Sequence, residues 1–349
     1  MSEYALLVAP ASNRVYAGEA PRLTSSELAV FGETVLGARP RDPAPTELGG
    51  VPYVGFATEA PLSPRDVAYL SNLSSGYALF AREGPELLRP VRLDPLARYD
   101  DDLITIPKYQ GKTNEQFTRL LLNVTVLASS RAAQMLDRRL VVLDPLCGRG
   151  TTLNQALMYG YDAIGVEGDG GQVEAYATFL RTWLRRKRLK HSVELHPVRQ
   201  HRQRVASRLD ATLAPSHQAH RDGDIQRVTV LHADTVRSRE LLQAGCCDVI
   251  VTDAPYGIAH RSRTGDQSGG ARDRSPLDLL AAAVPVWQQL LRRGGALGVA
   301  FNTHVAGRDE VAGLLAGAGL DVVTEPAYRG FGHWVDQGIT RDLLVARKP

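Results

Sequence analysis

The stretch LVVLDPLCGRGTT (140–152) decides the fold of this 349-residue chain. Its first part, 140–148, is a short apolar run that predicts a buried strand entering a glycine turn. The residues that follow, TTLNQALMYG (151–160), predict a helix that ends at Gly160. A strand that passes through glycines into a helix opens the alternating pattern that runs through the rest of the chain.

More apolar strands follow, and helices such as 276–293 separate them. The strands are predicted at 162–169, 227–234, 247–257 and 296–302, and two further strands within DVVTEPAY and TRDLLVARK form an antiparallel hairpin at one edge. Continuous apolar strands that alternate with helices indicate a parallel sheet with both faces covered. The sequence therefore predicts an α/β fold with a Rossmann-like, seven-stranded, mostly parallel sheet.

The first part of the chain, 1–107, has a different pattern and predicts a small α+β domain. Its strands are expected at 4–9, 51–58 and 76–83, its helices at 25–37 and 64–73, and a proline-rich turn, RPRDPAP, at 39–45. The acidic run Asp100–Asp102 and Pro107 form a natural linker. We therefore expect a second domain over 108–349, and a possible RNA-binding role for the first.

Composition excludes several classes of protein. Hydrophobic residues make up 44% of the chain, enough for a core, so bulk disorder is excluded. No apolar run approaches the roughly 18 residues that span a bilayer, and the N-terminus lacks the pattern of a secretion signal. Three cysteines without a CxxC pair predict neither a disulfide framework nor a zinc site. A cytoplasmic location, with no membrane partner and no metal, is the expectation.

Positive charge is concentrated in one part of the chain. Residues 181–208 hold 10 basic and 1 acidic side chains, although the whole chain carries a net charge of only +3. We interpret 181–226 as a basic insertion whose arginines and lysines bind phosphates. The alternative is the solvated face of an arginine-rich helix. The loop 260–275, rich in glycine and arginine, is a competing candidate for holding a substrate.

The glycine turn is a candidate ligand site. Ligands of open α/β sheets bind beyond the carboxyl ends of the strands, and two glycines let the backbone approach a ligand closely. The turn lacks the third glycine of the dinucleotide fingerprint and the Gly-Lys-Ser/Thr of a phosphate loop. The string DPLCGRGTT (144–152) resembles motif I of S-adenosylmethionine-dependent methyltransferases that act on amino groups. The resemblance implies S-adenosylmethionine as cofactor and these ligands: Asp144, Cys147, Gly148, Gly150 and Thr151.

Acidic residues end the next two strands. Glu167 stands about 20 residues past the turn, where an acid accepts hydrogen bonds from ribose hydroxyls. In the resembling enzymes an acid at the place of Asp234 holds the adenine amino group, although Asp234 suits an N-cap equally. Those enzymes also carry a segment that closes over the methionine end of the cofactor. The matching polar residues are Thr113 and Asn114, for which a helix N-cap is the alternative.

The fourth strand ends in TDAPYG (252–257), which looks like the D-P-P-Y motif of enzymes that methylate exocyclic amines of nucleobases. An aromatic amine is a poor nucleophile because its lone pair is delocalised. Acceptors that hold its N–H groups aim the lone pair at the methyl group, and we assign these roles to Asp253 and the backbone carbonyl of Ala254. Pro255 stiffens the turn, and Tyr256 stacks on a base that has left its stack.

Three segments together, GKTNEQFTRLLLN (111–123), DPLCGRGT (144–151) and TDAPYGI (252–258), resemble the tRNA guanosine N2-methyltransferases that modify position ten of tRNA. The resemblance lies mostly in 108–349. It implies a class I methyltransferase fold, methylation of guanine N2 and tRNA as partner. Members usually carry an RNA-binding THUMP domain, for which 1–107 looks too short. Some also need a small zinc-binding activator protein.

Two other functions stay open at this point. A DNA methyltransferase acting on adenine N6 or cytosine N4 shares both motifs, but it normally needs a target-recognition domain larger than the basic insertion. A non-catalytic protein that binds the cofactor or RNA is the third possibility, and the intact Asp253 and Tyr256 disfavour it. The sequence does not fix the oligomeric state.

Overall fold

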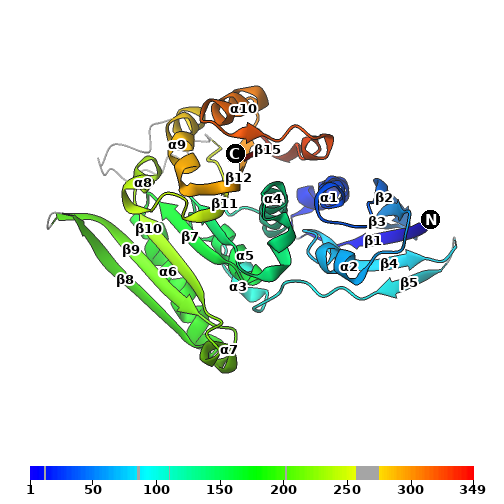
Figure 1. The fold of residues 1–349 in the computed structure, drawn as a ribbon, viewed down its shortest axis with the longest axis horizontal. Helices are drawn as coiled ribbons and strands as arrows, with labels where there is room; N and C mark the ends of the chain where they lie inside the picture. Colours follow the sequence, from blue (N-terminus) through cyan, green and yellow to red (C-terminus); the bar gives the residue numbers. More distant parts are fainter. Residues whose placement is uncertain (12, 85–86, 110, 201–202, 257–274) are drawn as a thin grey trace.

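The structure is a computed structural model that describes residues 1–349 apart from positions 12, 85–86, 110, 201–202 and 257–274. The side chains of 199–205 also lie outside the described part. Within it, two sheets form the framework, one of five strands and one of ten. Figure 1 shows the smaller sheet around the N-terminus and the larger one crossing the rest of the molecule.

The smaller sheet is antiparallel and has the strand order β2-β3-β1-β4-β5. Its elements are β1 (Ser2–Val8), α1 (Arg14–Thr34), β2 (Arg41–Leu48), β3 (Val51–Thr58), α2 (Pro64–Leu70), β4 (Gly76–Arg82) and β5 (Leu88–Val91). The helix expected at 25–37 begins 11 residues earlier, because the side chain of Asn13 caps it. The expected proline-rich turn is the edge strand β2, a position that tolerates proline.

Seven strands of the larger sheet are those predicted from the sequence. They are β6 (Val141–Asp144), β7 (Asp162–Glu167), β10 (Gln226–His232), β11 (Cys247–Asp253), β12 (Leu291–Asn302), β13 (Asp321–Val322) and β15 (Ile339–Arg347). Their order is β13-β15-β12-β11-β6-β7-β10, and only β15 runs against the others. The predicted Rossmann-like α/β fold is confirmed. The strand order reverses between β6 and β11, which is where such sheets bind ligands.

Helices cover both faces of this sheet (Figure 1). The longer ones are α4 (Glu115–Ala128), α5 (Thr151–Tyr159), α6 (Gly170–Arg186), α9 (Pro276–Leu290) and α10 (Arg308–Gly317). Successive strand residues point to opposite faces, so Val249 and Val251 join the core under α4, whereas Ile250 joins the core under α9. Short helical segments complete the chain: α3 (Asp102–Thr105), η1 (Ala132–Asp137), α7 (His217–Arg221), η2 (Thr235–Arg237), α8 (Ser238–Leu241) and η3 (Pro326–Arg329).

Three strands of the larger sheet were not expected. β14 (His333–Asp336) pairs with β15, and the basic insertion forms a hairpin of β8 (His191–Gln200) and β9 (Gln203–Leu213). β9 pairs with β10 as far as Ser207, opposite His232, and the hairpin continues beyond the carboxyl end of β10. The insertion is therefore an extension of the sheet that also projects past its ligand-binding edge.

The N-terminal sheet and the larger sheet share one core, since apolar residues of α1 and α4 belong to the same buried cluster. A polar contact is buried between them. The Glu27 carboxylate of α1 accepts hydrogen bonds from Asn123 Nδ2 of α4 at 2.7 Å and from Ser74 Oγ at 2.6 Å. This packing fixes the start of α1 beside the start of α4, where the candidate site begins.

Candidate active site

The glycine turn joins β6 to α5 at the carboxyl edge of the larger sheet. Gly148 and Gly150 have φ angles of +51° and +79°, which side chains other than glycine rarely adopt. A Cβ at Gly150 would lie 2.5 Å from the ring of Tyr176, whereas one at Gly148 would meet no atom within 4 Å. The turn is therefore packed on one side and open on the other, as a backbone cradle for a ligand must be.

Glu167 lies directly against this turn. Its Oε2 accepts a hydrogen bond from Gly148 N at 2.9 Å, and its Oε1 accepts one from Asp169 N at 2.8 Å. Burial raises the pKa of Glu167, and these backbone donors oppose that effect by favouring the carboxylate. Glu167 is thus fixed at the end of β7, and its carboxylate oxygens can accept further hydrogen bonds from hydroxyl groups.

Asp144 connects the glycine turn to β11. Its Oδ1 accepts hydrogen bonds from Leu146 N at 3.1 Å and from Thr252 Oγ1 at 3.0 Å. Asp144 is buried, and that burial raises its pKa to about 6. Cys147 is also buried, and its backbone N–H donates a hydrogen bond of 3.0 Å to the carbonyl oxygen of Val166 in β7. These contacts hold three neighbouring strand ends together.

Asp253 is the centre of a cluster at the end of β11. Its carboxylate accepts hydrogen bonds from Tyr256 Oη at 2.6 and 2.5 Å and from Thr113 Oγ1 at 2.7 Å. The guanidinium of Arg341 lies 3.4 Å from Asp253 and donates to Tyr256 Oη from Nε at 2.7 Å. Burial and the nearby Asp253 carboxylate raise the pKa of Tyr256, so its hydroxyl keeps the proton that it donates.

Tyr256 is therefore held more firmly than the sequence suggests. The guanidinium carbon of Arg341 lies 5.1 Å from the centre of its ring and 4.4 Å from that of Phe117. The same guanidinium donates hydrogen bonds to Tyr256 Oη, so Arg341 holds the tyrosine at its hydroxyl end. Ala254 is buried, with its amide bonded to the Ala300 carbonyl, and Pro255 is exposed.

The segment before α4 lies between the two motifs. Tyr109 Oη is 2.8 Å from Thr151 Oγ1 in the glycine turn, and Arg149 stacks 5.1 Å from the Tyr109 ring. Thr113 binds Asp253, whereas Asn114 caps α4 by accepting a hydrogen bond from Phe117 N at 3.1 Å. The segment thus lies over the glycine turn at one end and contacts Asp253 at the other.

Several sequence-based assignments receive a structural context that does not decide them. Asp234 caps the 3-10 segment η2, since its Oδ1 accepts from Val236 N at 3.1 Å. Gly257 and the loop 260–274 lie outside the described residues, as does Arg202. Among the described residues no group of three or more His, Cys, Asp or Glu could hold a metal ion, and no helix has both the length and the apolar character to cross a membrane.

Sequence reasoning missed Arg341 and Tyr109. Arg341 lies in β15, 85 positions after Tyr256, and no local sequence motif predicts its contact with Tyr256. Only the antiparallel pairing of β15 with β12, which sets Arg341 opposite Asn302, brings the guanidinium to the end of the sheet. Tyr109 stands two positions before Gly111 in a polar stretch, a pattern with no specific signal.

No protein-family model matches the chain, and no curated protein matches it. Solved structures do match. TrmN from Thermus thermophilus is 12% identical, with a TM-score of 0.44 and 100% of both chains covered. The fibrillarin pre-rRNA processing protein of Methanococcus jannaschii is 10% identical, with a TM-score of 0.38, covering 78% of this chain and 94% of that one. A TehB-like SAM-dependent methyltransferase from Corynebacterium glutamicum is 14% identical, with a TM-score of 0.33, covering 60% and 80%. These similarities define neither an activity nor a substrate.

Proposed function

We propose that this protein is an S-adenosylmethionine-dependent methyltransferase that acts on an exocyclic amine of a nucleobase, with guanine N2 of tRNA as its target. One observation carries the proposal. The hydrogen bond of 3.0 Å from Thr252 to Asp144 joins the Asp253 motif to the glycine turn across the point where the strand order reverses. An amine-holding carboxylate thus stands next to a turn suited to the cofactor.

The residues present fit the cofactor. The open side of Gly148 admits a ligand against the backbone, and Glu167 stands beside it to accept hydrogen bonds from ribose hydroxyls. The wider set of proposed cofactor residues is Asp144, Cys147, Gly148, Gly150, Thr151, Glu167, Asp234, Thr113 and Asn114. When bound, the cofactor supplies an electrophilic methyl group, and the protein positions the amine that receives it.

Asp253 and Ala254 are the proposed acceptors for the amine. An Asp253 oxygen and the Ala254 carbonyl would each accept one N–H, which keeps the nitrogen pyramidal and its lone pair directed at the methyl group. The contacts of Thr113, Tyr256 and Arg341 with Asp253 fix that carboxylate before the base arrives. Such preorganisation needs no rearrangement of charge during the reaction, which is how positioned dipoles accelerate it.

RNA is the proposed partner, and the basic insertion and the N-terminal unit are its proposed contacts. Arg185, Arg186, Arg188 and Lys190 are exposed where α6 leads into β8. By contrast, Lys187 pairs with Asp100 at 2.6 Å and Asp102 at 2.7 Å, so its charge is already compensated. We further propose a division into 1–107 and 108–349, a cytoplasmic location, and a small zinc-binding activator as a possible partner.

The test is methyl transfer from labelled S-adenosylmethionine to tRNA and, in parallel, to double-stranded DNA, followed by mass analysis of the nucleosides. N2-methylguanosine in tRNA is the expected product. N6-methyladenine or N4-methylcytosine in DNA would replace the RNA assignment by the DNA one. No methylated nucleoside from either substrate, with the Asp309→Ala protein as a control for handling, would reject the proposed reaction. Asp309 is exposed and far from Asp253 in sequence.

A further inference from the structure

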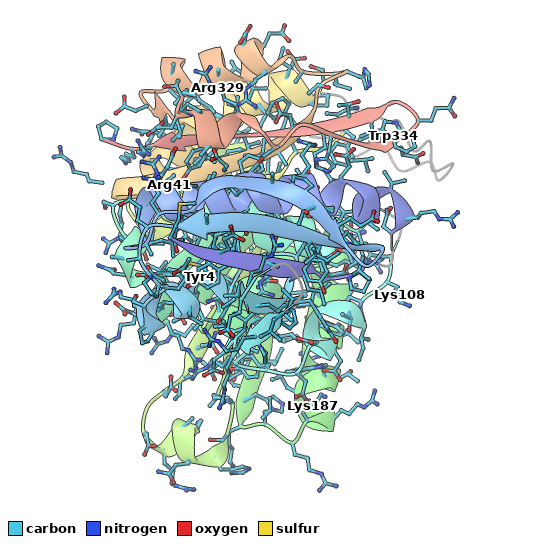
Figure 2. The ribbon with its side chains drawn as sticks, turned by 90° about the vertical axis from the view of Figure 1, so that its right-hand side faces the viewer. Tyr4, Arg41, Lys108, Lys187, Arg329 and Trp334 are labelled. Atoms are coloured by element: carbon cyan, nitrogen blue, oxygen red, sulfur yellow. The ribbon has the colours of Figure 1, made fainter. Side chains whose placement is uncertain are left out.

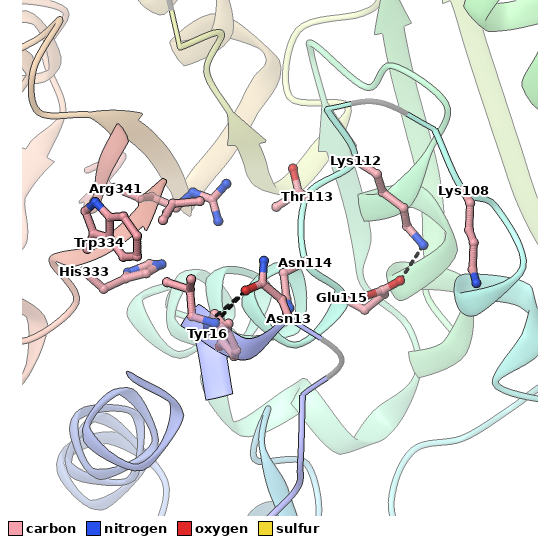
Figure 3. A pocket seen from close by; sticks show the side chains of 12 residues that line it. Asn13, Tyr16, Lys108, Lys112, Thr113, Asn114, Glu115, His333, Trp334 and Arg341 are labelled. Carbon is pink, nitrogen blue, oxygen red and sulfur yellow. Dashed lines mark hydrogen bonds and ion pairs between the residues drawn. The ribbon is translucent and has the colours of Figure 1, made fainter. Parts of the chain in front are cut away.

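A pocket of about 270 Å³ lies beside the Asp253 cluster (Figure 3). The start of α1, the segment before α4, and the strands β14 and β15 form its walls. Two residues of the wall, Thr113 and Arg341, also contact Asp253. The pocket is therefore next to the catalytic motif but separated from it by the thickness of one side chain.

His333 of β14 carries an unsatisfied polar atom in this wall. Its exposed fraction is 4%, and Nδ1 lies 2.9 Å from the carbonyl oxygen of Phe331. Because a carbonyl only accepts, Nδ1 is the protonated nitrogen, and burial lowers the pKa of His333, so the neutral ring is the stable form. Nε2 is then an acceptor, and it has no hydrogen-bond partner among the described residues.

A buried acceptor without a partner costs free energy, and here it points to a ligand that donates a hydrogen. The ring cannot turn away easily, because Phe117 packs on it with ring centres 5.2 Å apart and Tyr16 with centres 6.0 Å apart. Figure 3 shows His333 directed into the space between Arg341 and Asn13. A ligand in the pocket is therefore the candidate donor, since no described residue supplies one.

The rest of the lining suits an aromatic ligand that also carries negative charge. Trp334, which Figure 2 labels near the edge of the molecule, is 51% exposed at the rim of the pocket, although large apolar side chains are usually covered. Asn13 and Asn114 use their amide oxygens as helix caps, which leaves their NH2 groups as donors. Lys112 is paired with Glu115, whereas Lys108, at the other end of the pocket in Figure 3, has no ion pair with any described residue.

We propose that this pocket binds one nucleotide of the nucleic-acid substrate, next to the nucleotide that is methylated. The base stacks on Trp334 and donates an N–H to His333 Nε2, and its phosphate lies at Lys108. Every base offers an N–H, and stacking on an aromatic side chain is a general way of holding single-stranded bases. Thr113 and Arg341 lie between this base and Asp253, so the protein recognises the base but does not methylate it. The inference rests on the proposed function.

Trp334 supplies a direct measurement. The chain has 3 tryptophans, and the other two, Trp183 and Trp287, are 3% and 0% exposed, so a stacked base should quench mainly Trp334. The full chain is titrated, without cofactor, with guanosine, adenosine, cytidine and uridine monophosphates. Saturable quenching by at least one of them is expected. Absence of saturable binding for all four overturns the inference.

Three variants sharpen the test, with equilibrium dialysis of the labelled nucleotide as the readout. His333→Phe keeps a ring but removes the acceptor, and should weaken binding about tenfold. Trp334→Ala changes an exposed side chain, so it should fold normally and should weaken binding by a similar factor. Tyr77→Ala, at an aromatic residue that is 68% exposed on β4, is the matched control and should leave binding unchanged. Wild-type affinity in both His333→Phe and Trp334→Ala overturns the inference.

Methyl transfer separates this inference from the proposed function. If tRNA is methylated and both pocket variants keep the wild-type kcat/KM, the function stands and the pocket inference fails. If no nucleic acid is methylated but nucleotides bind in a manner that depends on His333, the function fails, and the pocket is a nucleotide site of some other activity.

Discussion

The two halves of the candidate site are built in different ways. The half proposed for the cofactor consists of β6, the glycine turn and β7, and its key contact, Glu167 to Gly148, joins residues only 19 positions apart. The half proposed for the substrate consists of Asp253, Thr113 and Arg341, together with a pocket that reaches from Asn13 to His333. One half is local in sequence, and the other is assembled from both ends of the chain.

This difference decides how each half can be altered. Glycines with positive φ and a strand-end acid form a unit that a short segment specifies by itself, so a change there should affect one ligand. In the substrate half, α1, α4 and β15 must all be in place before Asp253 is held correctly. A change in any of them should alter substrate handling without altering cofactor binding.

The largest expected effect comes from Asp253. Asp253→Ala and Tyr256→Ala remove the proposed acceptor and the stacking ring, so turnover should fall about 10³-fold, the scale found when a preorganised polar partner is removed. Cofactor affinity, measured by calorimetry, should stay close to wild type because neither group lies on the cofactor side. Near-normal turnover in either variant, or an equal loss in Asp309→Ala, would break the division between the two halves.

Arg341 should matter next, although no motif marks it. Arg341→Ala leaves the carboxylate of Asp253 without its cation, and breaking a buried ion pair in this way costs about 3–5 kcal/mol. The free energy of unfolding in urea measures this loss. Arg341→Lys should recover part of the stability but little turnover, because an ammonium cannot hold Tyr256 and Asp253 together as the guanidinium fork does.

A matched change at the exposed Arg293, Arg293→Ala, should alter the unfolding free energy by less than about 0.5 kcal/mol. If Arg341→Ala changes the unfolding free energy as little as this control does, Arg341 does not stabilise the cluster, and the substrate half depends less on the C-terminal strand than its contacts suggest.

The sequence predicted the fold well because its signals are local. Seven strands and the glycine turn follow from apolar runs and punctuating glycines, and the structure has all of them. It failed for β2, where two prolines suggested a turn, and for the hairpin 191–213, where clustered arginines suggested a helix face or loop. In both cases pairing with a neighbouring strand outweighed the local composition.

Site prediction divided along the same line. Glu167 ends β7, as its place after an apolar run predicted, and its role toward a ribose stays a prediction. The contact of Thr113 with Asp253 was not expected, its assignment to the cofactor stays a prediction, and Arg341 and His333 were not expected at the site. Their proximity depends on which strands pair and in what register, information that no single segment carries.

Asp144 offers a test of the bond that joins the halves. Burial raises its pKa from 3.8 to about 6, so the neutral form is favoured more strongly in the folded protein than in the unfolded chain. The stability that this provides is fully present below pH 3.8 and is lost as pH rises through about 6, a change of about 3 kcal/mol. Asp144→Asn, which stays neutral, should lack this decline when unfolding is followed from pH 4 to pH 8.

The variant Asp309→Asn should show the same decline as wild type, because position 309 is exposed to water in both the folded and the unfolded protein. A decline of equal size in Asp144→Asn would mean that another group is responsible for it.

Glu167 should give a smaller and more specific effect. Glu167→Ala removes the two proposed charge-assisted hydrogen bonds to a ribose, each worth roughly 1.5–3 kcal/mol when buried, and cofactor affinity should fall at least tenfold by calorimetry. Binding of nucleoside monophosphates to the Trp334 pocket should not change. Glu174→Ala, an exposed acid of α6, is the control. Unchanged cofactor affinity in Glu167→Ala would remove the cofactor assignment from this half.

The smallest effect concerns the basic insertion, which belongs to neither half. Replacing the exposed Arg185, Arg186, Arg188 and Lys190 by Gln should flatten the dependence of log affinity on log salt by about 2–3 units, since each phosphate contact on single-stranded RNA contributes about 0.7. Lys187 is left in place because Asp100 and Asp102 already neutralise it. Binding should weaken for all sequences alike, and cofactor affinity should stay unchanged.

The place of these four residues in the fold predicts a modest effect, and control variants separate it from a general effect of lost charge. α6 starts at the ligand-binding edge after β7 and runs away from it, so Arg185 and Arg186 at its end, with Arg188 and Lys190 just beyond it, lie farther from that edge. They can add affinity for an extended RNA but cannot orient the target base. Gln at four other exposed arginines, Arg237, Arg239, Arg293 and Arg329, should leave the salt slope nearly unchanged. If the α6 variant keeps the full slope while deletion of 263–272 abolishes binding, the loop holds the substrate and the basic residues are a solvated surface.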